Sequence, residues 1–201
     1  TATIMYGHVE RPKHWARHLI RVRDLQRKTG GFTEFVPLPF VHMEAPMYLK
    51  GKARKGPTFR EAILMHAVAR LALHGQIANI QTSWVKMGHE GVKACLNAGC
   101  NDLGGTLMNE SISRAADTQH CQETNTRQMA HLIRRLNRDP KQRSTAYGGV
   151  SDERIKAGQA QGELLEIINT PAEKYERKAP SAQLIRNPAR VESKFADHSG
   201  G

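Results

Sequence analysis

The sequence predicts an α/β fold in which parallel strands alternate with helices. Four stretches are apolar or β-prone and then end in polar or glycine-rich residues. They are residues 1–10 (TATIMYGHVE), 35–40 (FVPLPF), 80–86 (IQTSWVK) and 100–106 (CNDLGGT), and helical segments separate them. In an α/β barrel the residues just past the carboxyl ends of the strands carry the chemistry. The polar strand ends are therefore expected to converge on one site.

A helix and a second strand follow the first strand. Pro12 suits the first turn of a helix, and apolar residues recur at helical spacing until Gly30 ends it. The second strand, 35–40, contains Pro37 and Pro39, each of which removes a ladder donor. We expect this strand to end early and its prolines to shape the rim of the site.

A long loop and another helix come next. Residues 41–57 are rich in proline, glycine and lysine, and a loop of this length is more often functional than idle. His42 and Glu44 follow the second strand and are candidates for a lid, with ordinary loop residues as the favoured alternative. Thr58 and Glu61 have the spacing of a capping box, which predicts a helix start there.

The second half of the chain repeats the alternation. We expect a strand at 77–86, a helix at 91–98, a strand at 100–106, and helices at 107–115 and 126–138. Beyond Tyr147 the composition changes: residues 152–168 are predicted to be partly helical, and the remainder weakly ordered. We therefore divide the chain into a unit at 1–147 and a tail at 148–201.

Four β/α units cannot close a barrel, which takes eight. The first and fourth strands would leave apolar edges unpaired. The chain also begins inside a predicted strand and without an initiator methionine. We expect a fragment or processed piece: half of a (β/α) TIM-type barrel plus a C-terminal tail.

Composition restricts the class of protein. No apolar run approaches the roughly 18 residues that a membrane span needs, and no signal peptide is recognisable. Cys95, Cys100 and Cys121 have the spacing of neither a metal site nor a disulfide framework. We expect a cytoplasmic protein whose own residues bind no metal.

The net charge of +11 is concentrated in residues 1–75, which carry 13 Lys and Arg against five Asp and Glu. A basic face can attract nucleic acid. A solvated helix face is the favoured interpretation, because no nucleic-acid motif accompanies the charge. A basic, non-catalytic RNA-binding protein remains the alternative from a different class.

The strand motifs carry a family likeness over residues 1–147. TATIMYGHVE, KTGGFTEFVPLPF, IQTSWVKMG and NDLGGTLMNESIS, in this order and spacing, resemble the carboxyl-terminal part of the FO synthase family of radical S-adenosylmethionine (SAM) enzymes, in its 4-hydroxyphenyl transferase half. Relatives from the futalosine route to menaquinone share the strand motifs and are the enzymatic alternative. The PLPF motif at residues 37–40 favours the deazaflavin branch.

The resemblance implies strands five to eight of a radical SAM barrel. It implies a reaction that joins L-tyrosine to 5-amino-6-(D-ribitylamino)uracil, in which a [4Fe-4S] cluster cleaves SAM to a radical that abstracts hydrogen from tyrosine. The family's Cys-x3-Cys-x2-Cys cluster motif is absent here. The cluster ligands are therefore expected in a missing N-terminal barrel half, fused or separate, and this chain alone should be inactive.

The resemblance also implies site residues at the first strand. The family pattern G-x-I-x-G-x-x-E falls on Thr3 to Glu10, where Thr3 and Met5 replace the first Gly and Ile. Met5, Tyr6 and Gly7 would lie along the adenine of SAM, and Glu10 would orient the loop. The alternative is a plain core strand that ends in a turn.

Other polar residues follow from their places at the strand ends. His8 is the candidate for substrate bonding or proton transfer, with a structural histidine as the open alternative. Gln81 and Ser83 share one face of their strand and suit a uracil or tyrosine contact. Asn101 and Asp102 precede a glycine-rich turn and either bind a ligand or simply make the turn.

Overall fold

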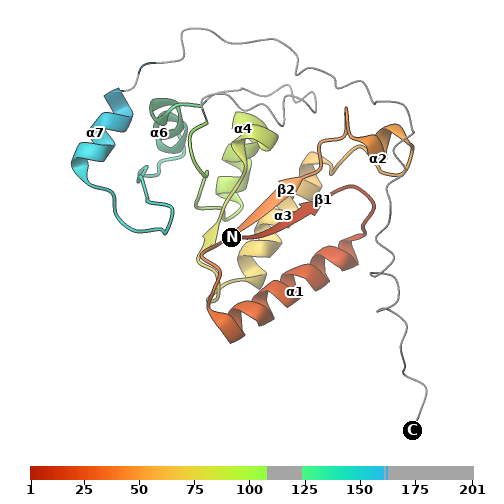
Figure 1. The fold of residues 1–201 in the computed structure, drawn as a ribbon. Helices are drawn as coiled ribbons and strands as arrows, with labels where there is room; N and C mark the ends of the chain where they lie inside the picture. Colours follow the sequence, from red (N-terminus) through yellow and green to blue (C-terminus); the bar gives the residue numbers. More distant parts are fainter. Residues whose placement is uncertain (108–123, 161, 163–201) are drawn as a thin grey trace, which may run out of the picture.

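The computed structural model is an α/β fold built on a three-stranded parallel sheet of order β1-β2-β3 (Figure 1). It describes residues 1–107, 124–160 and 162. Its elements are β1 (Ala2–Tyr6), α1 (Pro12–Thr29), β2 (Glu34–Pro39), α2 (Pro46–Leu49), α3 (Phe59–Ala72), β3 (Asn79–Ile80), α4 (Trp84–Asn97), α6 (Thr126–Arg134) and α7 (Asp152–Ala160).

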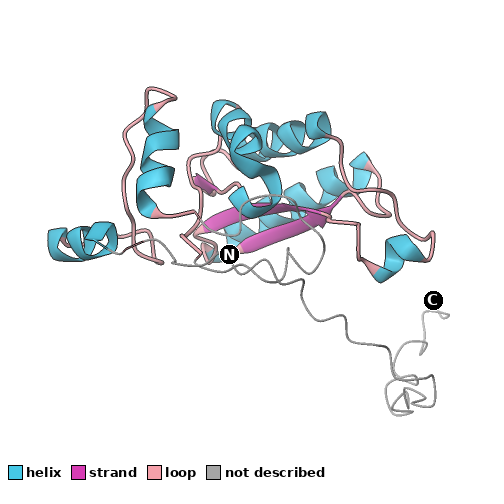
Figure 2. Ribbon diagram, turned by 90° about the horizontal axis from the view of Figure 1, so that it is seen from above, coloured by secondary structure: helices cyan, strands magenta, loops and turns pink. Residues whose placement is uncertain are grey.

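The core lies between one face of the sheet and the helices α1, α3 and α4 (Figure 2). In β1 the buried residues Ala2, Ile4 and Tyr6 alternate with the exposed Thr3 and Met5. Successive strand residues point to opposite faces, so the sheet has a helix-covered face and a second face, here called the open face. The open face carries Thr3 and Met5.

Two helix starts are as the sequence predicted. Pro12 opens α1, and Gly30 ends it in the left-handed conformation with φ 61°. At α3 the Thr58 hydroxyl accepts the Glu61 N–H at 3.2 Å, and the Glu61 carboxylate accepts the Thr58 N–H at 2.7 Å. This reciprocal pair satisfies two backbone donors that a helix start leaves unpaired.

The expectation that the second strand ends early is wrong, because β2 runs through Pro39. Backbone groups of alternate residues face the same neighbouring strand, and the Phe35 carbonyl accepts the Gln81 N–H on the β3 side. The missing donors of Pro37 and Pro39 therefore also face that side. β3 pairs only with the first two residues of β2, so neither proline breaks a ladder bond.

The third strand is much shorter than expected. β3 comprises only Asn79 and Ile80, and α4 already begins at Trp84. The helix predicted at 91–98 is the second part of α4, which bends at Gly88. The predicted strand conformation of 84–86 is therefore wrong: the aromatic and β-branched residues there lie in a helix whose Trp84 ring is buried.

The predicted fourth strand contributes one parallel bridge, between Gln81 and Asp102, rather than a full strand. The Thr82 N–H donates to the Asp102 carbonyl at 2.9 Å, so the segment does extend the sheet beyond β3. The described residues thus form a partial α/β fold. The helix predicted at 107–115 lies, after its first residue, outside the described residues, and so does the tail from 163 onward.

α6 and α7 lie beside one another at the end of the described chain (Figure 1). The Thr126 hydroxyl donates to the Gly158 carbonyl at 3.4 Å, and Arg127 donates to the Gln159 carbonyl at 3.1 Å.

None of the helices in the described ranges is long and apolar enough to cross a membrane.

Candidate functional site

Glu10 organises the turn that follows β1. Its carboxylate accepts the backbone N–H groups of Gly7, His8 and Val9, the latter two at 3.0 Å. It also accepts the indole N–H of Trp15 at 2.7 Å. One side chain therefore binds four donors and ties the turn to α1.

These donors shift the acidity of Glu10. Burial by itself would raise the pKa of the carboxyl group, but the N–H groups of Gly7 and His8 and the Trp15 indole together lower it to about 2. Hydrogen bonds to the charged form favour that form. Glu10 is therefore an anion at neutral pH.

His8 stands between this carboxylate and an aromatic ring. Its Nδ1 atom lies 3.2 Å from Glu10 Oε2, and its ring packs edge-on against Phe40, with centroids 5.6 Å apart. The His8 side chain is 24% exposed. Nδ1 makes no hydrogen bond to the described residues, so the closeness of the Glu10 carboxylate and the Phe40 ring, rather than a hydrogen bond, holds the imidazole. The other ring nitrogen can bond a substrate.

Gly7 lies under the loop 41–57. It has φ 93°, and a Cβ on it would lie 2.3 Å from Pro57 Cδ. The loop is also tied to the turn by the Arg54 N–H, which donates to the His8 carbonyl at 3.1 Å. The space beside the Gly7 α-carbon is therefore filled by this chain's own Pro57. The predicted loop 41–57 contains the short helix α2, and His42 packs edge-on against Tyr48 of that helix.

Met5 and Tyr6 point in opposite directions. Met5 is 55% exposed on the open face, whereas Tyr6 is fully buried and packs edge-on against Trp15. The Tyr6 hydroxyl has no hydrogen-bond partner among the described residues, and burial raises its pKa. Only Met5 can therefore offer its side chain to a ligand on the open face.

The sheet register places Gln81 on the open face. Asn79 pairs with Glu34, which lies two residues before the open-face register partner of Thr3. Gln81 lies two residues after Asn79 and so shares its face. Gln81 and Ser83 are half-buried, and Ser83 is the N-cap of α4, without a side-chain capping bond.

Asn101 and Asp102 have intramolecular partners. The Asn101 carboxamide oxygen accepts Arg70 Nη2 at 2.7 Å and the Ile80 N–H at 2.9 Å. The Asp102 carboxylate accepts the Gly104 N–H at 2.6 Å, and its two oxygens accept hydrogen bonds from Nε and Nη2 of Arg143. A ligand would have to compete with these groups for either side chain.

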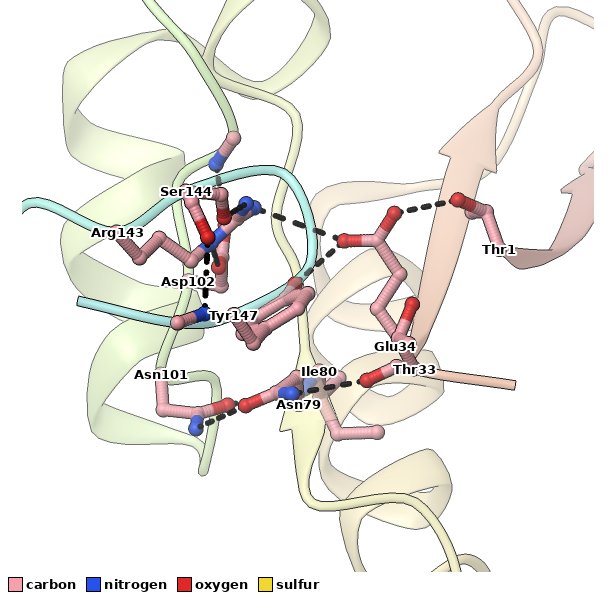
Figure 3. Close-up of polar contacts among 12 residues, drawn as sticks. Thr1, Thr33, Glu34, Asn79, Ile80, Asn101, Asp102, Arg143, Ser144 and Tyr147 are labelled. Carbon is pink, nitrogen blue, oxygen red and sulfur yellow. Dashed lines mark hydrogen bonds and ion pairs between the residues drawn. The ribbon is translucent and has the colours of Figure 1, made fainter. Parts of the chain in front are cut away.

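Three residues of this region were missed by the sequence reasoning: Glu34, Arg143 and Tyr147 (Figure 3). Arg143 contacts Glu34 as well as Asp102, and the Tyr147 hydroxyl donates to Glu34. Hydrogen bonding to Asp102 raises the pKa of Arg143, and burial with the bond to Glu34 raises that of Tyr147. Partners so distant in sequence leave no local pattern that could have revealed them.

The strand ends meet in two pairs. The turn after β1 contacts the loop after β2, and Gln81 contacts the turn after Asp102, where a Cβ on Gly104 would lie 2.0 Å from Gln81 Nε2. Cys95 and Cys100 are buried free thiols, and Cys121 lies outside the described residues. In the described ranges, no three His, Cys, Asp or Glu side chains are placed to hold a metal ion.

Comparison with known proteins identifies the sequence family of this chain. Residues 29–154, more than half of the chain, match the profile of the family described as CofH/MqnC C-terminal region. The FO synthase of Nocardia farcinica is 53% identical over 150 residues, which are 75% of this chain and 17% of that protein. The FO synthase of Mycobacterium leprae is 52% identical over 147 residues, with 73% and 17% covered.

A shorter relative matches over a stretch of similar length. The 5-amino-6-(D-ribitylamino)uracil--L-tyrosine 4-hydroxyphenyl transferase of Methanocaldococcus jannaschii is 48% identical over 147 residues, which are 73% of this chain and 41% of that protein. The chain spans less than half the length of each of these relatives. They confirm the resemblance that the four strand motifs predicted. By its match over residues 29–154, the chain belongs to the CofH/MqnC C-terminal region family.

Proposed function

We propose that this chain is the carboxyl-terminal half of a radical SAM transferase of deazaflavin biosynthesis. The enzyme would join the 4-hydroxybenzyl group of L-tyrosine to 5-amino-6-(D-ribitylamino)uracil. The observation that carries the proposal is the identity of about half of all aligned residues with FO synthases and with a named 4-hydroxyphenyl transferase. The aligned stretch is long enough to include the strand-end motifs.

Met5 is the side chain that supports SAM binding best. It is exposed on the open face, and its backbone groups face away from β2, since those of Tyr6 face toward it. An apolar side chain beside backbone polar groups at the edge of the described sheet suits a purine ring. SAM, when bound, supplies the radical that abstracts hydrogen from tyrosine. Gly7 would contribute through the turn it allows, and Tyr6 through packing beneath Met5.

The described residues do not fit a [4Fe-4S] cluster, because they hold no group of three suitable ligands. In this proposal the cluster ligands belong to the amino-terminal barrel half, which the family's designation as a C-terminal region supports. No residue of this chain is assigned a role in binding the cluster.

Two criteria support the proposed substrate contacts: the face of the sheet on which a side chain lies, and whether its polar atoms already bind other described residues. Gln81, on the open face, is the proposed uracil contact, and Ser83 is its neighbour at the start of α4. His8, whose Nδ1 atom lies 3.2 Å from the Glu10 carboxylate, is the proposed group that bonds the substrate or moves a proton through its second ring nitrogen. Asn101 and Asp102 would shape the site rather than bind ligand, because both have strong internal partners.

The test uses the full product of the gene that encodes this chain. It is reconstituted anaerobically with iron and sulfide and supplied with SAM, L-tyrosine and the ribitylaminouracil. We expect consumption of the uracil with formation of a coupled product and 5′-deoxyadenosine. Deoxyadenosine without uracil coupling would move the protein to the menaquinone branch, which the family description also covers. No SAM cleavage would contradict the proposal.

A matched pair of variants tests the substrate contact. Gln81→Leu removes the proposed hydrogen-bonding group and is expected to raise the KM for the uracil roughly tenfold or more. Gln159→Leu, at an exposed position of α7, is expected to leave it unchanged. Equal KM values in the two variants would remove Gln81 from the site.

A further inference from the structure

A cluster of four side chains ties a late segment of the chain to the open face of the sheet (Figure 3). The Arg143 cluster consists of Glu34, Asp102, Arg143 and Tyr147. The Arg143 Nε contacts Asp102 Oδ2, and its Nη2 donates to Asp102 Oδ1 at 2.9 Å. The same Nη2 lies 3.6 Å from Glu34 Oε2.

Tyr147 closes the cluster. Its ring centroid lies 3.9 Å from the Arg143 guanidinium carbon, and its hydroxyl donates to Glu34. The Asp102 side chain is only 6% exposed and that of Glu34 is 14% exposed. Exposed ion pairs order little, but a two-atom arginine–carboxylate contact at this burial fixes both side chains.

The segment that carries Arg143 is itself folded. The Ser144 N–H donates to the Gly148 carbonyl at 3.0 Å, and the Gly148 N–H donates back to the Ser144 hydroxyl at 2.9 Å. Arg143 Nη1 donates to the Ser144 carbonyl at 3.2 Å. The guanidinium group is therefore held from its own side as well as from the sheet.

Asp102 passes this order to the turn that follows it. Its Oδ1 accepts the Gly104 N–H at 2.6 Å. Gly104 has φ 75°, and its bare α-carbon is the surface against which the Gln81 carboxamide packs. The Gly105 carbonyl accepts the Trp84 indole N–H at 3.0 Å. A continuous set of contacts thus runs from Arg143 to Gln81.

We propose that Arg143 is a positioning residue for the substrate site. It fixes Asp102 and, through the Gly104 turn, sets the position of the Gln81 carboxamide at the carboxyl end of the third strand. This role rests on the proposed function, in which Gln81 contacts the uracil. Arginine suits it because a planar fork binds both carboxylate oxygens at once, which lysine cannot do.

The experiment compares Arg143→Met and Arg143→Lys in the full gene product with Arg134→Met as the matched control. Arg134 is exposed on α6 and lies outside the Arg143 cluster. The first measurement is hydrogen exchange of the peptide that contains Gly104, with a peptide from α1 as reference. The second is the KM for the ribitylaminouracil beside the rate of SAM cleavage.

We expect Arg143→Met to speed exchange at Gly104 at least tenfold with α1 unchanged, and to raise the KM for the uracil while SAM cleavage persists. Arg143→Lys should fall between it and the wild type, and Arg134→Met should match the wild type. Exchange at Gly104 that stays at the wild-type rate, or that rises equally in α1, would overturn the proposal.

Two further outcomes are distinguishable. If the wild type forms no coupled product, the proposed function fails, and hydrogen exchange still decides whether Arg143 positions the turn. If Arg143→Met does not fold, Tyr147→Phe replaces it, because that variant removes only the hydroxyl that binds Glu34. Unchanged Gly104 exchange in both Tyr147→Phe and Arg143→Lys would then overturn the proposal.

Discussion

At the scale of a single residue, Glu10 links acidity to stability. Its pKa is about 2 in the folded chain, against an ordinary value of 4.5. A depressed folded-state pKa stabilises the fold above the unfolded-state pKa, and this contribution is lost as the pH falls from about 4.5 to about 2. At pH 7 we expect Glu10→Gln to cost roughly 1–3 kcal/mol of unfolding free energy, a range that allows for solvent screening.

The difference between wild type and Glu10→Gln should therefore shrink as the pH is lowered from 5 toward 2. Urea unfolding at a series of pH values measures it. Glu90→Gln is the control, because the Glu90 carboxylate is largely exposed and pairs only with the nearby Lys93 in the described part of the chain. A pH-independent gap for Glu10→Gln would mean that the turn is held by packing rather than by the carboxylate charge.

At the scale of an element, the loop 41–57 is seated on Gly7. Gly7 and Gly51 both have positive φ, so an alanine strains the backbone at either site. Only at Gly7 would the new Cβ collide with Pro57, since nothing lies within 4 Å of the Gly51 position. We expect Gly51→Ala to cost about 1 kcal/mol and Gly7→Ala distinctly more, because Pro57 must also move.

Trypsin supplies the second readout for the loop, which carries Lys50, Lys52 and Arg54. Cleavage there should be faster in Gly7→Ala than in Gly51→Ala, because only the first variant displaces the loop from its seat. Equal stability and equal cleavage in the two variants would show that Pro57 yields without cost. The glycine would then serve only the backbone conformation.

Helix starts and turns were predictable where the residues that determine them are close in sequence. The starts of α1 and α3 were predictable because Pro12, and Thr58 with Glu61, act within a few residues of themselves. The start of α4 was not, because Ser83 makes no side-chain capping bond and the residues after it favour strands. The break after β1 was predictable from Gly7 for the same local reason, whereas the role of Glu10 in orienting the loop came from the family resemblance.

The candidate site likewise contains residues that the local sequence could reveal and residues that it could not. His8 could be singled out because it follows the predicted first strand, and Gln81 because it shares a polar face of the predicted third strand with Ser83. The partners of Asp102 and Glu34 could not be predicted. Arg143 lies 41 residues after Asp102, and Tyr147 lies 113 residues after Glu34. The tertiary fold alone brings such groups together, and their burial then gives them energetic weight.

At the scale of the whole molecule, the exposure of Met5 depends on whether the open face becomes the inside of a barrel. Met5 is 55% exposed in this chain, so Met5→Glu is expected to change its stability by less than about 0.5 kcal/mol. In the full gene product, where we propose that an amino-terminal barrel half covers this face, the same change should cost roughly 1–3 kcal/mol, since a carboxylate would be buried without a partner.

Leu71→Glu is the matched control for that comparison, because Leu71 is 77% exposed on α3, away from the open face. It should cost the same small amount in both forms of the protein. Unfolding midpoints of the two variants in the two forms make the measurement. If Met5→Glu were equally harmless in the full gene product, the open face would not be the inside of a barrel. The SAM contact assigned to Met5 would then lose its structural basis, while the family membership, which rests on sequence, would stand.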